Sequence, residues 1–432
     1  MTYIRKSIIQ GIDSNGQEID IKVNSTGKIM TDDTSVNSLS DKFQRTNFNE
    51  LRTTNRISQM NFKPTWGVST LRYTQDMIGG ANISEVNGEY RLFSGNGNSQ
   101  YATLKTKERG QYVAGSIGSV GIGIRLPSIP GGSKYAEWGY SDLVTSGFFF
   151  GADSNGLYVG YIFNSIKTKI YQNNWNCDKL DGDCASKLNI DLSLGVICEI
   201  NFSWYGYGDI EYVYYVYDNS VNELKRVVVH HMKINSRVSI EDPNQPLCFK
   251  VQNDNSGSGV ELFVGGHQFS IIDSGSESEK RYASEIIRAY TLGTNTNWQP
   301  LIAIRKKSTF GPSSRVNSTK VKFKNLEIAS SSELEVRLTI NSTTNNLTWA
   351  SPTGWDTTES SVETKISAGT QLTTSVVGYP TLYSFVNTAS TRVIDQEFEI
   401  NEGNEVIIWV RRLSATGTMT IKLASMQWVE EW

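Results

Sequence analysis

Residues 174–217 read NWNCDKLDGDCASKLNIDLSLGVICEINFSWYGYGDIEYVYYVY, and the second half of this stretch decides the fold. From Cys198 to Trp204 apolar and polar residues alternate, which is the pattern of a strand with one buried face. The run Tyr205 to Gly208 interrupts the alternation with two glycines, which adopt the positive φ angles that a turn needs. Residues 210–217 then alternate with aromatic and β-branched residues on both faces. The stretch therefore predicts a β-hairpin.

The same stretch carries a second pattern, the order WNCDKLDG, LNIDLS, EINFSWYGYGDIEYVYYV. This order resembles a family of bacteriophage virion proteins, in which a WN-D-LDG loop precedes LDLS and an I-x-(D/N)-x-x-W-x-G-x-G-x-(I/V) hairpin. Further segments agree in the same order: YSD with GFFFGADSNGLYVG before the hairpin, and AIRKKSTF and EVIIWVRRLSATGT after it. The chain departs from the family at Tyr205 and Tyr207, where small aliphatic residues are usual, and at Cys177 and Cys184 in the loop.

The resemblance touches most of residues 85–432. It implies a component of a tailed-phage particle without saying which part. The expected location is the virion, and the expected partners are other virion proteins and copies of the chain itself.

Length and composition limit the classes of protein that fit. With 432 residues the chain is too long for one ordinary core, so two or three domains are expected. Its 37 Gly, 20 Tyr, 16 Phe and 10 Trp fit a turn-rich all-β protein. The formal net charge is −3 and the basic residues are scattered, so we expect no nucleic-acid partner. No run of 18 apolar residues or signal-peptide core occurs, so we expect no membrane contact and synthesis in the host bacterial cytoplasm.

The strand patterns predict three regions. Residues 1–60 are polar and are expected to form an extended N-terminal arm, with one short hairpin that turns at Asn15-Gly16. Residues 61–328 carry more than ten short strand patterns, which predict a large antiparallel β-sandwich of jelly-roll or lectin-like type. The small polar run Ala329 to Ser332 predicts a boundary, and residues 329–432 are expected to form a smaller β-sandwich.

The same alternation predicts the core of the larger domain, and residues 276–290 leave a choice open. The predicted core residues are Phe148, Phe150, Tyr158, Ile200, Phe202, Trp204, Val228, Phe249, Val251 and Leu262. Residues 276–290 fit either a capped helix or a strand with Tyr282, Ile286 and Tyr290 on one face. The family resemblance favours the strand.

Three aspartates in one loop, Asp178, Asp181 and Asp183, form a candidate metal site because clustered carboxylates bind Ca²⁺. Their spacing does not fit the twelve-residue calcium loop, and aspartate beside Gly182 also caps the backbone amides of a turn. Capping is the favoured interpretation, so no metal and no cofactor are expected.

The cysteines and histidines give no metal-site spacing. Cys177 and Cys184 are separated by six residues, and His230 and His231 would point to opposite faces of a strand. Cys198 and Cys248 lie in apolar strand patterns and are expected in the core, and His267 follows two glycines and is expected in a turn.

No catalytic signature appears, since G-x-S-x-G, H-E-x-x-H, the phosphate loop G-x-x-x-x-G-K-[ST] and G-x-G-x-x-G are all missing. Glycoside hydrolysis needs only two carboxylates that the fold brings together, and no pair among 44 acidic residues stands out. The sequence therefore predicts a protein that is not an enzyme.

Aromatic residues give the strongest candidate contact surface. Tyr205, Tyr207, Tyr215 and Tyr217 lie at or near the hairpin, where one set of rings must face a second layer, a partner or a glycan. Trp428 and Trp432 lie near the end of the sequence and are expected to dock into a neighbouring subunit.

Three functions are compatible with these patterns. The leading prediction is a non-enzymatic structural component of the virion that acts through assembly contacts. The alternative is a host-recognition fibre or adhesin that binds surface glycan through the exposed aromatic residues. A tail-associated enzyme that degrades glycan ranks last.

Overall fold

The computed structural model describes residues 9–12, 18–21, 55–203, 207–233, 240–255, 257–273, 280–292, 296–311, 314–340, 349–352, 360–366, 381–388, 392–414 and 416–431. These residues form strands and three short 3-10 helices, and all of their strand pairs are antiparallel. The predicted all-β fold is confirmed. The chain divides into two compact units, Met1–Thr54 and Asn55–Trp432. None of the described helices is long and apolar enough to span a membrane.

The first unit contains the predicted short hairpin. Strands β1 (Ile9–Ile12) and β2 (Glu18–Ile21) pair antiparallel, with Ile9 opposite Ile21. The Asn15-Gly16 turn and the rest of the predicted arm up to residue 54 lie outside the described residues.

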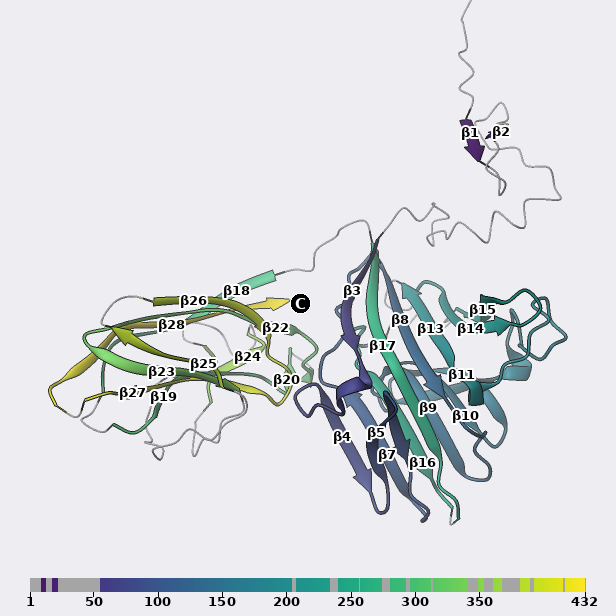
Figure 1. Cartoon of the computed structure of the whole chain (residues 1–432), viewed down its shortest axis with the longest axis horizontal. Helices are drawn as coiled ribbons and strands as arrows, with labels where there is room; N and C mark the ends of the chain where they lie inside the picture. Colours follow the sequence, from purple (N-terminus) through teal and green to yellow (C-terminus); the bar gives the residue numbers. More distant parts are fainter. Residues whose placement is uncertain are drawn as a thin grey trace, which may run out of the picture. The chain divides into compact units, whose positions relative to one another are not determined.

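The second unit begins with a large sandwich of two sheets (Figure 1). The seven-stranded sheet has the order β12 (Ile166–Tyr171), β11 (Gly156–Phe163), β10 (Gly147–Asp153), β9 (Lys134–Ser141), β16 (Leu247–Asn253), β7 (Gln100–Thr106), β4 (Tyr73–Ile78). The eight-stranded sheet has the order β15 (Glu223–Met232), β14 (Ile210–Asp218), β13 (Val196–Ser203), β8 (Ile117–Arg125), β17 (Glu261–Asp273), β6 (Glu89–Phe93), β5 (Asn82–Val86). Its eighth strand, β3 (Asn55–Phe62), also pairs with β17.

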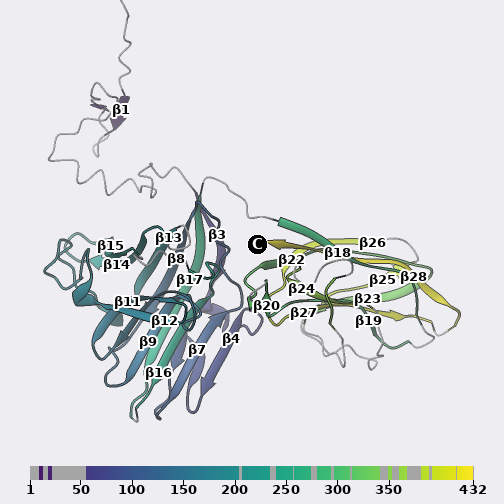
Figure 2. The same cartoon turned by 180° about the vertical axis from the view of Figure 1, so that it is seen from behind.

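The predicted hairpin is the β13–β14 pair, with Cys198 opposite Tyr214 and Ile200 opposite Tyr212. Seen from behind, β13 and β14 lie next to β15 and β8 in the eight-stranded sheet (Figure 2). The inward residues of both sheets form one apolar core. Because β13 alternates strictly, every second residue of this strand lies on the opposite, outer face of the sheet.

Most of the predicted core residues are confirmed. Phe148, Phe150, Ile200, Phe202, Phe249, Val251 and Leu262 are buried in this core, whereas Tyr158 is buried in a separate cluster with Phe149 and Cys248. Trp204 lies outside the described residues. Val228 is only half-buried, and Val227 and Val229 occupy the core instead. The strand pairing shifts register between Tyr212 and Val213, and such an irregularity changes which residues of the partner strand face inward.

The predicted arm ended too late in the sequence. Residues 55–60 belong to β3, which pairs with β17 from Asn55 to Phe62. Met60 and Phe62 are buried in the core of the large sandwich, and the Phe62 ring stacks on His267 with 5.1 Å between centroids. The residues around Met60 and Phe62 are polar, so the sequence pattern does not identify these two as core residues.

The second sandwich begins about 50 residues before the predicted boundary, since β18 already belongs to it. One sheet has the order β18 (Lys280–Leu292), β28 (Met419–Glu431), β22 (Lys320–Ser330), β26 (Arg392–Glu399). The other has the order β24 (Val362–Ile366), β19 (Gln299–Lys306), β27 (Glu405–Arg412), β23 (Glu333–Ile340), β25 (Thr381–Thr388). The polar run at 329–332 connects β22 in one sheet to β23 in the other, so it is a turn within a domain. A two-stranded sheet of β20 (Thr309–Phe310) and β21 (Arg315–Val316) completes the strands.

Two further predictions are decided by this sandwich. Residues 280–292 form a strand rather than a helix, as the family resemblance implied. Trp428 was expected to dock into a neighbouring subunit, but it is 1% exposed, belongs to the core of the second sandwich and donates from Nε1 to Glu430 Oε1 at 3.1 Å. It lies in β28, whose inward face this sandwich buries. Trp432 lies outside the described residues.

His267 is a core residue of β17 rather than a turn residue, because the two glycines before it form an irregularity within the strand. Its Nε2 lies 2.8 Å from the Tyr73 hydroxyl, and its Nδ1 lies 2.9 Å from the Gly265 carbonyl oxygen. The two contacts fit a neutral ring in which Nδ1 donates and Nε2 accepts. Burial lowers the pKa of His267 to about 4.

A truncation series tests the assignment of β3. Removing residues 1–54 should leave the thermal unfolding temperature of the second unit unchanged, because the deletion ends before β3 begins. Removing residues 1–62 should lower the unfolding temperature sharply, because it takes Met60 and Phe62 out of the core. Loss of one such buried side chain costs about 3 kcal/mol. Equal unfolding temperatures for the two truncations would contradict the core role of β3.

The buried His267 predicts a loss of stability in mild acid. An unfolded histidine titrates near pH 6.5, so between about pH 6.5 and 4 the unfolded chain binds a proton that the native chain does not. The stabilisation that comes from keeping His267 neutral is fully present above this window. The free energy of unfolding falls by about 3 kcal/mol as the pH drops through it. Urea unfolding from pH 7 to pH 4 should show a smaller loss in His267→Gln than in the wild type. Parallel curves for the two proteins would refute the assignment.

Candidate functional site

The outer face of the eight-stranded sheet carries polar side chains that are as buried as core residues. Cys198, Ile200 and Phe202 fill the core, so Glu199 and Asn201 point to the other side of β13. Their exposed fractions are nevertheless only 4% and 5%. We call Glu199, Asn201, Glu211, Tyr215, Arg226, Ser119 and Ser270 together the outer polar face.

A bridging amide and a guanidinium hold two carboxylates of this face together. Asn201 Nδ2 donates to Glu199 Oε1 at 2.7 Å and to Glu211 Oε2 at 2.9 Å. Arg226 on β15 forms an ion pair with Glu211 and lies 3.9 Å from Glu199 Oε1. Burial disfavours the guanidinium cation, but the carboxylates of Glu211 and Glu199 outweigh this effect and raise the pKa of Arg226.

Glu199 receives two further donors. The Tyr215 hydroxyl donates to Glu199 Oε2 at 3.1 Å, and Arg56 Nη2 donates to the same oxygen at 3.3 Å. Burial and the nearby charge of Glu199 raise the pKa of Tyr215, so its hydroxyl remains a donor at neutral pH. Glu199 is thus the centre of a network that joins β13, β14 and β3.

The contact between Arg56 and Glu199 shows that this face is concave. Arg56 lies on β3, and β17 and β8 separate it from β13. On a flat sheet three strand spacings would place the two backbones about 14 Å apart, before any offset along the strands. The register adds such an offset, since Arg56 aligns through Ile272 and Ile117 with Ser203 rather than with Glu199. The side chains meet only because the sheet curves toward them.

Three polar atoms beside this network have no hydrogen-bond partner within the described structure. They are Asn201 Oδ1, Ser119 Oγ and Ser270 Oγ, and each is buried. The strand register places them in one row, because Asn201 is opposite Ser119 on β8 and Ser119 is opposite Ser270 on β17. Since the large majority of buried polar atoms in proteins are paired with protein groups or ordered water, three such atoms in register mark a place that water or a ligand can occupy.

The position next to the row carries no side chain. Gly121 follows Ser119 on the same face of β8, between Glu199 and Gln268. A Cβ atom at Gly121 would meet only Gln268 atoms, at 3.5 Å or more. The backbone of β8 is therefore the floor of the face beside the row.

The predicted aromatic contact residues reach this face only in part. Tyr215 belongs to it, and Tyr217 is the next residue of β14 on that side, 48% exposed and hydrogen-bonded to Asn222. Tyr207 is 65% exposed between β13 and β14, and Tyr205 lies outside the described residues.

The aspartate loop caps its own backbone, as favoured from the sequence. Asp178 accepts from the amides of Leu180 at 2.9 Å and Ser186 at 2.8 Å, and Asp181 accepts from the amide of Asp183 at 3.0 Å. Within the described ranges no group of three His, Cys, Asp or Glu side chains is arranged to hold a metal ion. Cys198 and Cys248 are buried, as predicted.

Sequence reasoning missed Ser119, Ser270 and Arg226. The alternation of β13 places Glu199 and Asn201 on the outer face, so the position of these two residues could be predicted from the sequence. Ser119 comes 82 residues before Asn201 and Ser270 comes 69 residues after it, so only the order of the strands in the sheet brings the three together. Nothing in their local sequence distinguishes them from other strand serines.

The arrangement supports binding better than hydrolysis. Glu199 and Glu211 share one amide donor, which places them about as close as the roughly 5 Å pair of a retaining glycosidase. A glycosidase uses one carboxyl of its pair as a proton donor, whereas here Arg226 lies against both carboxylates. Both groups are thus engaged as ion-pair partners of the same cation.

Removing Arg226 tests whether the network stabilises the fold. Arg226→Met leaves two adjacent carboxylates without their shared cation and should lower the free energy of unfolding by about 3 kcal/mol in urea titrations. The control Arg91→Met breaks the more exposed pair with Glu261 on the same sheet, and should cost less than about 1 kcal/mol. Similar costs for the two variants would contradict the account of this network.

No protein-family model and no curated protein sequence matches the chain. Several solved structures share part of its β-architecture. A legume lectin-like domain from Entamoeba histolytica is 13% identical, with a TM-score of 0.29, over 46% of this chain and 89% of that one. A Bauhinia forficata lectin in complex with GalNAc is 11% identical, with a TM-score of 0.31, over 51% and 100%. A β-glucanase assigned as putative from Mycobacterium abscessus is 11% identical, with a TM-score of 0.33, over 49% and 99%.

Proposed function

We propose that this chain is a particle protein of a tailed phage that binds a glycan on the host surface through its outer polar face. The sequence pattern around the hairpin supports the particle assignment. The geometry of the outer polar face supports the glycan. Hydrolysis is not part of the proposal.

The row of Asn201 Oδ1, Ser119 Oγ and Ser270 Oγ carries the proposal. A buried polar atom without a partner costs about 1–3 kcal/mol, so a ligand that pairs with it recovers that free energy on binding. Because Ser119 and Ser270 are 0% exposed, the ligand reaches them only when the side chains that cover them move aside. Sugars carry hydroxyl groups that both donate and accept, and they can therefore satisfy an amide oxygen and two serine hydroxyls together. Adjacent atoms of the row are separated by about one strand spacing, roughly 4.8 Å, which is the scale of a sugar ring.

The surroundings of the row also suit a sugar chain. The concave sheet lets side chains from several strands reach one ligand, and Gly121 leaves the floor beside the row without a side chain. Tyr207, six residues after Asn201 between β13 and β14, offers an exposed aromatic ring, and such a ring combines an apolar face with a polar tip.

Subunit assembly is a second candidate function, favoured by β18. This strand lies at the edge of its sheet, and its residues Tyr282 and Ile286 are 71% and 41% exposed. An exposed edge strand with large apolar residues is suited to pairing with another chain. Other virion proteins and copies of this chain are the proposed partners.

The double variant Ser119→Ala/Ser270→Ala tests the glycan proposal. It removes two unpartnered hydroxyls, so the free protein should be as stable as the wild type or more stable in urea titrations. Affinity for host surface glycan should fall about tenfold or more, because each lost hydrogen bond is worth about 1 kcal/mol. The measurement is binding of both proteins to a glycan array and then to the best hit by calorimetry.

Two controls keep this result interpretable. Thr74→Ala removes an exposed hydroxyl of β4, in the seven-stranded sheet and away from the row, and should leave affinity unchanged. Release of reducing ends from the same glycan is measured in parallel. The glycan proposal fails if the double variant binds like the wild type, and release of reducing ends would show an enzyme instead.

A further inference from the structure

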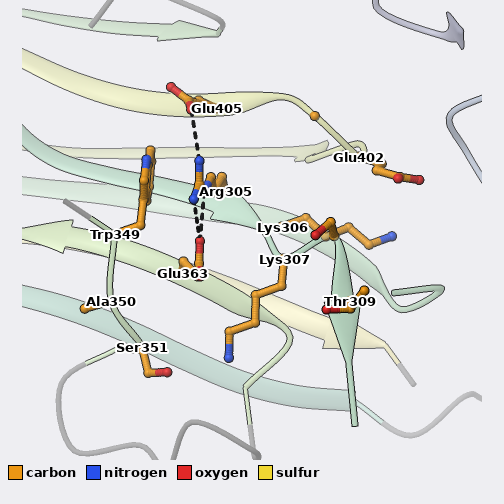
Figure 3. Close-up of a pocket in the computed structure, with 12 residues that line it drawn as sticks. Arg305, Lys306, Lys307, Thr309, Trp349, Ala350, Ser351, Glu363, Glu402 and Glu405 are labelled. Atoms are coloured by element: carbon orange, nitrogen blue, oxygen red, sulfur yellow. Dashed lines mark hydrogen bonds and ion pairs between the residues drawn. The ribbon is translucent and has the colours of Figure 1, made fainter. Parts of the chain in front are cut away.

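A second candidate site lies in the second sandwich, on a segment that the family resemblance had already singled out. A pocket of about 710 Å³ is lined by residues 305–309, by Trp349 to Ser351, by Glu363 on β24 and by the segment from Glu402 to Glu405 (Figure 3). This volume is in the range of small-molecule sites. The first of these segments belongs to the AIRKKSTF motif.

Arg305 contacts three other residues that line the pocket. The Arg305 guanidinium lies over the Trp349 ring, 4.4 Å from its centroid. Its Nε donates to Glu363 Oε2 at 2.8 Å, and its Nη1 lies 3.6 Å from Glu405 Oε1. Figure 3 shows the guanidinium between the two carboxylates and beside the indole. Arg305, Glu363 and Glu405 therefore balance one another's charge and hold the indole in place.

The two lysines that follow Arg305, Lys306 and Lys307, differ in their hydrogen-bond partners. Lys307 Nζ donates to the Ser360 carbonyl oxygen at 2.6 Å. Lys306 is only 8% exposed, and within the described part of the chain its ammonium makes no hydrogen bond or ion pair. In Figure 3 its side chain extends away from Trp349 toward the end of the pocket where Glu402 lies. The carboxylates of Glu399, Glu402 and Asp242 favour the charged form of Lys306, but within the described residues none forms an ion pair with it. A ligand anion that contacts the ammonium directly therefore gains free energy.

We propose that this pocket binds a saccharide that carries an anionic group, a carboxylate or a phosphate, with Lys306 as the partner of the anion. The hydroxyls of Ser308 and Thr309, which follow Lys306 in the chain and line the same pocket, are available for the hydroxyl groups of the sugar. This inference adds a site to the proposed function and does not depend on the outer polar face, because the pocket lies on different strands.

The charges around Lys306 give the site a pH dependence. Burial, together with the positive charge of Arg109, lowers the pKa of Lys306 to about 8, while Glu399, Glu402 and Asp242 oppose this shift. The ammonium is therefore protonated at neutral pH and loses its proton above about pH 8. Affinity for the anion should be present below this pH and fall above it.

Three matched monosaccharides test the proposal on the full chain: glucuronate, glucose 6-phosphate and glucose. Dissociation constants are measured by ligand-detected NMR at pH 7 and pH 9. We expect one or both acids to bind at least ten times more tightly than glucose at pH 7, and to lose most of this advantage at pH 9. The ratio of the two acids identifies whether the anion is a carboxylate or a phosphate.

Lys306→Met should abolish the preference for the acids without lowering stability, because it removes an unpartnered buried charge. The matched control Lys422→Met removes an exposed lysine of β28 that does not line the pocket, and should change the dissociation constants less than threefold. The Ser119→Ala/Ser270→Ala variant should bind the acids normally, so failure of one site is distinguishable from failure of the other. Equal binding of all three sugars, no binding of either acid at millimolar concentrations, or an unchanged preference in Lys306→Met would each overturn the proposal.

Discussion

Packing of aromatic rings between the two sheets of the large sandwich is the interaction on which the rest of this domain depends. Phe150 of one sheet meets Tyr212 and Tyr214 of the other with centroid distances of 5.4 and 5.0 Å, and Trp138 Nε1 donates to Cys198 Sγ at 3.3 Å. These inward contacts fix the register of β13 and β14, because a slip by one residue would turn every inward side chain outward. The core therefore decides which residues the sheet presents on its outer face.

That constraint explains how much of the fold the sequence could reveal. Alternation in residues 198–217 was sufficient for the hairpin and for most core residues, since a strand with one buried face leaves a period-2 signal. The pattern failed where a local irregularity intervened, as at Val228, and where two core residues lay in polar surroundings, as at Met60 and Phe62. The domain boundary was misplaced because a polar turn between sheets looks the same in sequence as a polar linker between domains.

The candidate sites were less accessible to sequence reasoning, for a different reason. The row of Asn201, Ser119 and Ser270 exists only because three strands from distant parts of the chain align in register. Lys306 is likewise an ordinary residue of a basic motif until the fold buries it, with no ion-pair partner among the residues that the structure describes. The two sites also differ physically. Within the described residues, the outer polar face leaves three neutral polar atoms and Arg226 Nε without a hydrogen-bond partner, whereas the pocket leaves a lysine ammonium without an ion-pair partner.

The central claim is that a host glycan pairs with the atoms that the fold leaves unpaired on the outer polar face. A crystal structure of the full chain with a bound host glycan tests it most directly. The account predicts sugar hydroxyls within hydrogen-bond distance of Asn201 Oδ1, Ser119 Oγ and Ser270 Oγ, over the backbone of β8 at Gly121. A glycan bound elsewhere, with the three atoms still unpaired or satisfied by ordered water alone, would contradict it.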